Sequence, residues 1–116
     1  MMKMKEKRND SVLILSLEGE IMGGEETKVI QERVYQAIRE RTPFVILDMK
    51  DVEWINSSGL GSLMACLTTL RGSGGDLRLA HVSDRVRRPI QITRLDQVLV
   101  MFDSVPDAAK DFGEGG

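Results

Sequence analysis

A short run near the middle of the chain holds the groups best placed for chemistry. It reads Asn-Ser-Ser-Gly-Leu-Gly over residues 56–61 and opens a segment whose apolar residues recur at helical spacing. A serine hydroxyl at a helix start lies beside unpaired backbone N–H groups and the positive end of the helix dipole, so a phosphate is tolerated there. Its added charge of about −1.5 to −2 would perturb an apolar or acidic partner surface docked over that helix end. The run is therefore compatible with a serine that acts as a phosphorylation-controlled binding switch.

A second interpretation of the same residues is purely structural. Asparagine and serine are the residues that most often cap helix N-termini, so Asn56, Ser57 or Ser58 could simply be a cap. Gly59 and Gly61 favour the switch, because two residues without side chains leave the helix start open to a kinase or to a partner backbone. The residues alone leave both interpretations open.

His81 offers a third kind of chemistry. It closes an apolar strand, and parallel strands would bring it beside Asp48 and Ser58 in a hydrolase-like arrangement. A hydrolase nucleophile elbow needs glycine two residues to each side of its serine, and Asn56 and Leu60 occupy those positions. A structural role for His81 is therefore favoured. The enzymatic alternative predicts hydrolysis of activated esters that His81→Ala abolishes.

The sequence indicates no cofactor or metal site. The glycine-rich run Gly-Ser-Gly-Gly over 72–75, and the glycines at 59 and 61, lack the lysine and the spacing of a phosphate-binding loop. The single cysteine, Cys66, has no neighbours with the spacing of zinc ligands. We therefore predict no cofactor and no metal. A nucleotide-binding role stays open, although no residue is singled out for it.

Arginines gather around a predicted helix that begins at Ser83. They are Arg85, Arg87, Arg88 and Arg94. A solvated helix face is the simpler interpretation of this cluster, and a patch for an acidic partner is the sharper one. Trp54, flanked by Val52 and Ile55, is interpreted as a core residue rather than an interface residue.

The elements that position these residues alternate along the chain. Strands are predicted over 2–9, 11–21, 44–47, 76–82 and 98–102, and helices over 25–41, from the serines to 72, from Ser83 with a kink or split at Pro89, and from Ser104. The first strand is alternatively a mobile terminus, and a loop is predicted over 49–54, after Asp48. Strands joined by helices become parallel neighbours, whereas the first two can form an antiparallel hairpin. The pattern predicts an α/β domain with a small mixed β-sheet of about five strands and about four covering helices, in the order ββαβαβαβα.

Length and composition bound the remaining possibilities. With 116 residues, 41% of them hydrophobic, we expect one domain over 1–112 and a disordered tail over 113–116. The 16 lysines and arginines against 18 acidic residues argue against direct nucleic-acid binding. The charged N-terminus lacks the apolar core of a signal peptide, and no apolar run reaches membrane-spanning length. Together with the lone cysteine, these features predict a cytoplasmic protein without membrane insertion.

Three segments carry a resemblance to a known family. The sequence Ile-Asn-Ser-Ser-Gly-Leu-Gly over 55–61 resembles the phosphorylation-site motif of STAS domains in bacterial anti-sigma factor antagonists. Leu-Glu-Gly-Glu-Ile over 17–21 and Ile-Thr-Arg-Leu-Asp over 92–96 resemble that family's flanking segments. The resemblance implies a STAS-like fold without catalysis, with Ser58 as phosphoacceptor, Ser57 as second choice, and the run from Asn56 to Gly61 as the partner-binding surface.

The resemblance also implies how such a switch is used. The unphosphorylated protein would sequester a kinase-like anti-sigma factor and free a sigma factor for transcription, as in stress signalling. Phosphorylation would end that binding, and a serine phosphatase would reset it. Asn56 departs from the family, which commonly has aspartate there, and this loss of charge bears on kinase recognition. The alternative is a scaffold subunit in a larger STAS assembly, such as a stressosome or a lipid-transport complex.

Overall fold

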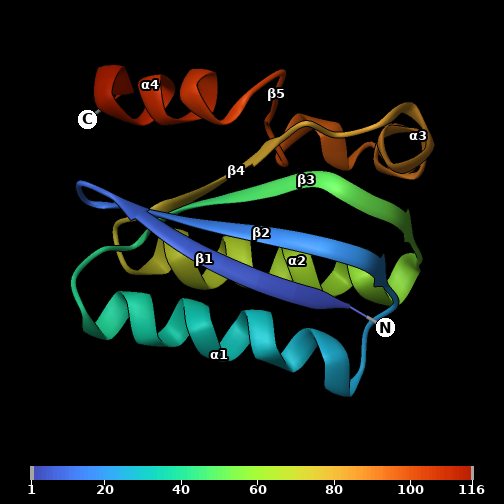
Figure 1. The fold of residues 1–116 in the computed structure, drawn as a ribbon, viewed down its shortest axis with the longest axis horizontal. Coiled ribbons are helices and arrows are strands. Elements are labelled where there is room, and N and C mark those ends of the chain that lie inside the picture. The colour runs from blue at the N-terminus through green and yellow to red at the C-terminus, as the bar shows by residue number, and fades with distance from the viewer. Residues whose placement is uncertain (1, 116) are drawn as a thin grey trace.

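Five strands form one mixed sheet in the order β1-β2-β3-β4-β5 (Figure 1). The computed structural model describes residues 2–115, with side chains up to residue 112. The elements are β1 (Lys3–Asn9), β2 (Val12–Ile21), α1 (Glu25–Arg39), β3 (Phe44–Ile55), α2 (Ser57–Gly72), β4 (Asp76–Ala80), α3 (Asp84–Ile92), the 3-10 turn η1 (Leu95–Gln97), β5 (Met101–Phe102) and α4 (Val105–Gly115). The predicted α/β class and the order ββαβαβαβα are confirmed.

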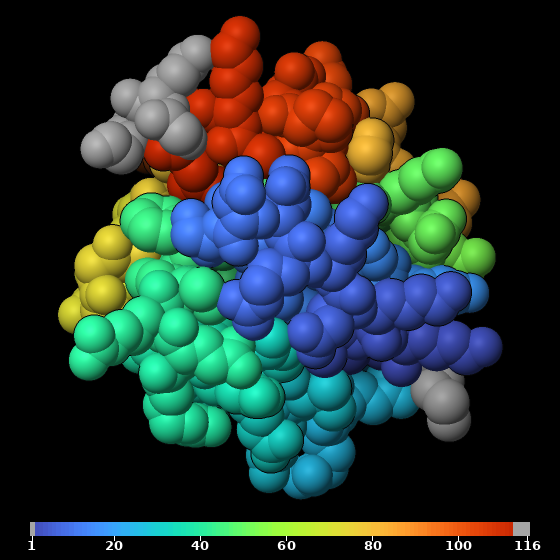
Figure 2. All heavy atoms as spheres, turned by 60° about the vertical axis from the view of Figure 1, so that its left-hand side comes forward, coloured from blue at the N-terminus to red at the C-terminus, as the bar shows by residue number. Residues whose placement is uncertain are grey.

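The first strand, β1, lies at one edge of the sheet. It pairs antiparallel with β2, from Lys3 opposite Glu18 to Asn9 opposite Val12. Nearly all its side chains are exposed, and its lysines discourage pairing with another chain. Figure 2 shows this hairpin at the surface between α1 and α4. The remaining neighbours in the sheet pair in parallel, as predicted.

Different helices cover the two faces of the sheet, with α1 and α2 on one face and α4 on the other (Figure 1). Leu13 and Leu15 of β2 belong to the larger core, which includes residues of α1 and α2. Ile14 and Ile46 belong instead to a smaller core with Phe112 of α4. The first half of β3 is therefore buried on both faces, which explains why its apolar run does not alternate.

The strand β3 is longer than predicted, and the predicted loop over 49–54 is wrong. The strand continues to Ile55 beside β2, where Val52 lies opposite Gly19. Two register shifts give β3 more residues than β2 over this stretch, as β-bulges do. The buried residues Met49, Val52 and Ile55 consequently stand three positions apart and hide the two-residue period of a strand.

The other differences lie in the last third of the chain. The helix α3 continues past Pro89 without a break, although proline removes one helical hydrogen bond. β5 is shorter than the predicted strand over 98–102, because the chain first forms η1. α4 reaches Gly115, past the start of the predicted tail, and Gly116 lies outside the described residues, so the domain boundary after 112 stays a prediction. None of the described helices is long and apolar enough to cross a membrane.

Candidate functional site

The serine run lies at the junction of β3 and α2, and Asn56 caps the helix. Asn56 has extended backbone geometry, and its side-chain Oδ1 accepts a hydrogen bond from the backbone N–H of Gly59 at 2.8 Å. Capping is therefore the role of Asn56 and not of the serines. Ser57 and Ser58 are both exposed, and within the described part of the chain their hydroxyls form no hydrogen bond.

The electrostatic setting of the two hydroxyls favours an anion. The first turn of α2, all of which is described, carries no acidic side chain. Its free N–H groups and the positive end of the helix dipole are therefore not offset by an acidic side chain of that turn. An amide at Asn56 performs the capping that a carboxylate would perform, and it leaves this positive potential intact.

Gly59 forms the closed side of the helix start. A Cβ on Gly59 would lie 2.0 Å from the backbone oxygen of Ile21, so only glycine permits this contact between α2 and the end of β2. The backbone N–H of Asn56 also donates to that oxygen, at 3.3 Å. The prediction that Gly59 keeps the helix start open is thus wrong. An open helix start is found instead at Gly61, which is exposed and where a Cβ would meet no described atom within 4 Å.

The loop between β2 and α1 lies against Ser58. Gly23, with a positive φ of 84°, is so close that a Cβ there would lie 2.4 Å from the Cβ of Ser58. Behind it, the hydroxyl of Ser62 donates to the backbone oxygen of Ser58 and lies 3.1 Å from the hydroxyl of Thr27. Thr27 in turn donates to Gly24. Sequence reasoning missed this hydrogen-bonded support, although Ser62 stands four residues after Ser58 on the same helix face.

A groove of about 510 Å³ opens on the other side of the serine run, between the end of β3 and α3. Its lining residues are Trp54, Ile55, Asn56, Ser57, Leu60, Arg85, Arg88, Pro89, Ile92 and Thr93.

Two large apolar residues of the groove are exposed, Trp54 to 43% and Ile92 to 71%. The interpretation of Trp54 as a core residue is therefore wrong. The second bulge in β3 falls at this point of the strand and turns Trp54 outward between the buried Val52 and Ile55. Leu60 is only 4% exposed and anchors the helix start in the core.

Cys66, in the middle of α2, is a packing residue. It is 2% exposed, and burial raises the pKa of its thiol to about 12. The thiol therefore stays protonated near neutral pH and is a poor nucleophile and a poor metal ligand. This agrees with its place in the large core beneath the sheet.

His81 and Asp48 lie together, but Ser58 is not with them. The Nδ1 atom of His81 is 3.0 Å from Oδ1 of Asp48. β3 continues for seven residues beyond Asp48 to Ile55, which places the serine run roughly 20 Å away along the strand. The hydrolase-like arrangement of Ser58, Asp48 and His81 is therefore wrong. The pair links the middle of β3 to the end of β4, since Asp48 lies opposite Ala80 in the register.

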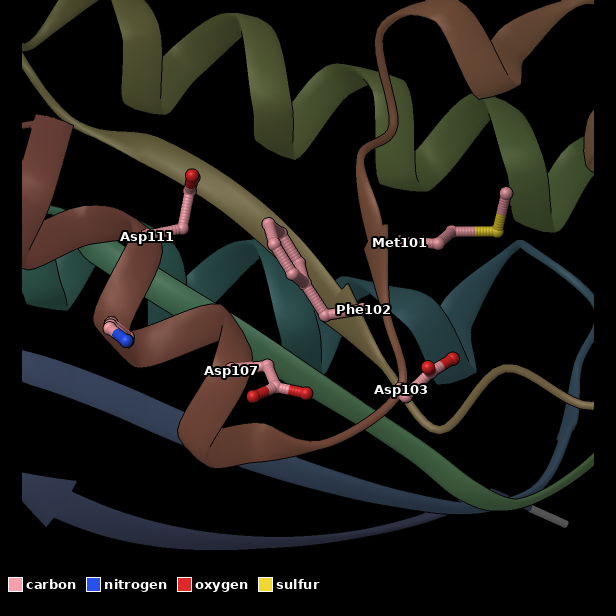
Figure 3. Close-up of a pocket in the computed structure, with 6 residues that line it drawn as sticks. Met101, Phe102, Asp103, Asp107 and Asp111 are labelled. Carbon is pink, nitrogen blue, oxygen red and sulfur yellow. The ribbon is translucent and has the colours of Figure 1, made fainter.

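A second hollow, of about 350 Å³, lies beside the first turns of α4 and is acidic. Figure 3 shows Asp103, Asp107 and Asp111 around it, next to Phe102. Asp111 is engaged by the guanidinium of Arg78 at 2.7 Å. Among the described residues, no group of His, Cys, Asp or Glu side chains is arranged to hold a metal ion.

Comparisons with known proteins identify several relatives. A Thermotoga neapolitana protein with a provisional assignment as an anti-sigma factor antagonist is 31% identical over 67 residues, which cover 58% of this chain and 59% of the relative. This match thus spans less than two thirds of the relative's length. The anti-sigma-B factor antagonist of Bacillus subtilis is 27% identical over 80% of this chain and 84% of its own length.

A solved structure and a family model match more of this chain than the Thermotoga neapolitana relative does. The crystal structure of a Thermotoga maritima protein with the same provisional assignment has a TM-score of 0.84 at 25% identity and covers 94% of this chain and 93% of its own. The STAS domain model matches residues 3–108, which include β1 and the start of α4. The chain belongs to the STAS domain family.

Proposed function

We propose that this protein is an anti-sigma factor antagonist whose binding is controlled by phosphorylation of Ser58. In its unphosphorylated form it sequesters a kinase-like anti-sigma factor, and a sigma factor is freed for transcription. The named relatives, the anti-sigma-B factor antagonist of Bacillus subtilis among them, support the general role. The observation that carries the proposal is the free, exposed Ser58 hydroxyl beside a helix start that Asn56 already caps.

The geometry supports a switch that leaves the fold intact. Because the cap is Asn56, a phosphate on Ser58 displaces no hydrogen bond of the serine hydroxyl among the described residues. The phosphate would add a charge of about −1.5 to −2 at a helix end that favours anions. Its effect would therefore fall on a docked partner rather than on α2.

Ser58 is preferred to Ser57 on the resemblance, and its surroundings support the choice. Gly23 presents no side chain over Ser58, so the loop between β2 and α1 leaves its hydroxyl exposed. The backbone oxygen of Ser58 accepts a hydrogen bond from the hydroxyl of Ser62, which supports the helix backbone that carries the Ser58 hydroxyl. The anti-sigma factor would supply the kinase, a serine phosphatase would reset the site, and the protein itself would catalyse nothing.

A pull-down tests the partner and the switch together. Wild-type protein, Ser58→Ala and Ser58→Asp are used as baits in lysate of the native host, and retained proteins are identified by mass spectrometry. Ser11→Asp is the matched control, because Ser11 is an exposed serine in the β1–β2 turn, at the opposite end of β2. We expect wild type, Ser58→Ala and the control to retain a kinase-like anti-sigma factor and Ser58→Asp to lose it.

Two results would contradict the proposal. Retention of the same proteins by all four baits would show that Ser58 is no switch and would favour the scaffold role. Retention of no anti-sigma factor by any bait would remove the antagonist role itself. Thermal unfolding of each bait is measured alongside, because loss of folding in Ser58→Asp would identify a structural serine.

A further inference from the structure

The groove beside Ser57 leaves two large apolar side chains exposed. Trp54, at the end of β3, and Ile92, at the end of α3, line it, with exposed fractions of 43% and 71%. Figure 1 shows α3 and the β3–α2 junction at the same end of the molecule. Apolar side chains held in a concave surface are the usual anchors of a protein interface.

Two arginines border the same groove. Arg85 and Arg88 line it and are exposed, and within the described part of the chain neither forms an ion pair or a hydrogen bond through its side chain. Four other arginines hold carboxylates, as Arg33 does with Glu6 at 2.8 Å; the others of this kind are Arg8, Arg71 and Arg78. The charge at the groove is therefore positive and unpaired in a chain whose net charge is −2.

We propose that this groove binds an acidic amphipathic segment of the partner protein. An apolar side chain of the segment packs between Trp54 and Ile92, and neighbouring carboxylates bind Arg85 and Arg88. The shape of the groove and its exposed apolar side chains favour the apolar contact, and charge complementarity favours the contacts between arginines and carboxylates. The inference rests on the proposed function, since the occupant is a segment of the partner that Ser58 controls.

The proposal accounts for release of the partner by a phosphate. Ser57 lines the groove directly, and Ser58 is the next residue of the same helix turn. A phosphate on Ser58, one residue from this lining, would repel the carboxylates of the segment. A basic or neutral segment would feel no such repulsion.

The test uses the purified chain and a displayed library of random short peptides as the probe, so it needs no anti-sigma factor. Enriched peptides are titrated against the protein by the fluorescence of Trp54, the chain's single tryptophan. Arg85→Glu/Arg88→Glu and Ile92→Ser test the two contacts. Arg39→Glu/Arg41→Glu is the matched control, because it makes the same charge change at exposed arginines at the end of α1.

We expect the enriched peptides to combine Asp or Glu with large apolar residues and to shift the tryptophan emission. Wild type and the control should bind them equally, and the two groove variants about tenfold more weakly. Enrichment of neutral or basic peptides, equal binding by Arg85→Glu/Arg88→Glu, or no enrichment would overturn the proposal. Each of these results is distinct from failure of the proposed function, which is decided by the Ser58→Asp bait.

Discussion

The two sides of the first turn of α2 differ in what they contact. On the inner side, Gly59 touches the backbone of Ile21, and Asn56 binds both that backbone and the helix. On the outer side, Ser57, Ser58 and Gly61 are exposed. The same short run therefore holds residues fixed by packing and residues exposed to solvent, and we expect that a charge added to the second group leaves the first undisturbed.

The largest effect is expected at Gly59. Gly59→Ala would place a Cβ 2.0 Å from the oxygen of Ile21, so α2 must move away from β2. We expect a loss of about 3 kcal/mol in the free energy of unfolding, measured by urea denaturation. A loss below about 0.5 kcal/mol would show that the inner side is not closely packed.

The second largest effect on stability is expected at the helix cap. Asn56→Ala removes the acceptor for the Gly59 N–H and should lower the free energy of unfolding by about 1 kcal/mol. Asn56→Asp is the control, since a carboxylate keeps the cap and adds a favourable charge at the helix N-terminus. If both variants lose stability equally, capping is not what Asn56 contributes.

Gly61 should respond in the opposite direction to Gly59. A Cβ on Gly61 meets no described atom within 4 Å, and the residue lies inside the helix. Gly61→Ala should therefore raise the free energy of unfolding by about 0.5–1 kcal/mol, because alanine is the better helix former. A destabilisation measured in the same urea series would mean that the outer side is not open.

The smallest effect on stability is expected at the serines. Ser57→Ala and Ser58→Ala remove hydroxyls that form no hydrogen bond among the described residues. Each should change the free energy of unfolding by less than about 0.5 kcal/mol. A larger loss of unfolding free energy for Ser58→Ala, measured by calorimetry, would show that the hydroxyl has a structural role. The outer side of the turn would then also contribute to stability.

Regular periods made most of the fold predictable. Leu13, Leu15 and Leu17 alternate along β2, and Ile30 and Val34 repeat along α1, so both elements follow from the sequence. The second half of β3 could not be predicted from the sequence, because bulges changed the spacing of its buried residues and left Trp54 exposed. Bulges depend on the neighbouring strand, which a local pattern does not record.

The candidate site was predictable only in part. The serine run and its place at a helix start follow from local sequence, and the resemblance singled out Ser58. The sequence did not show why residue 59 must be glycine, because this requirement comes from its contact with Ile21, which is distant in the chain. The groove was missed for the same reason, since Trp54 of β3 and Ile92 of α3 come together only in the folded domain.

The central claim is that a phosphate on Ser58 changes binding and leaves the fold unchanged. The most direct test installs phosphoserine at position 58 and compares this protein with the unmodified chain by calorimetry and by titration with the anti-sigma factor that the wild-type bait retains. We expect the same unfolding temperature within about 4 °C and loss of binding. A much lower unfolding temperature, or binding as tight as that of the unmodified chain, would contradict the claim.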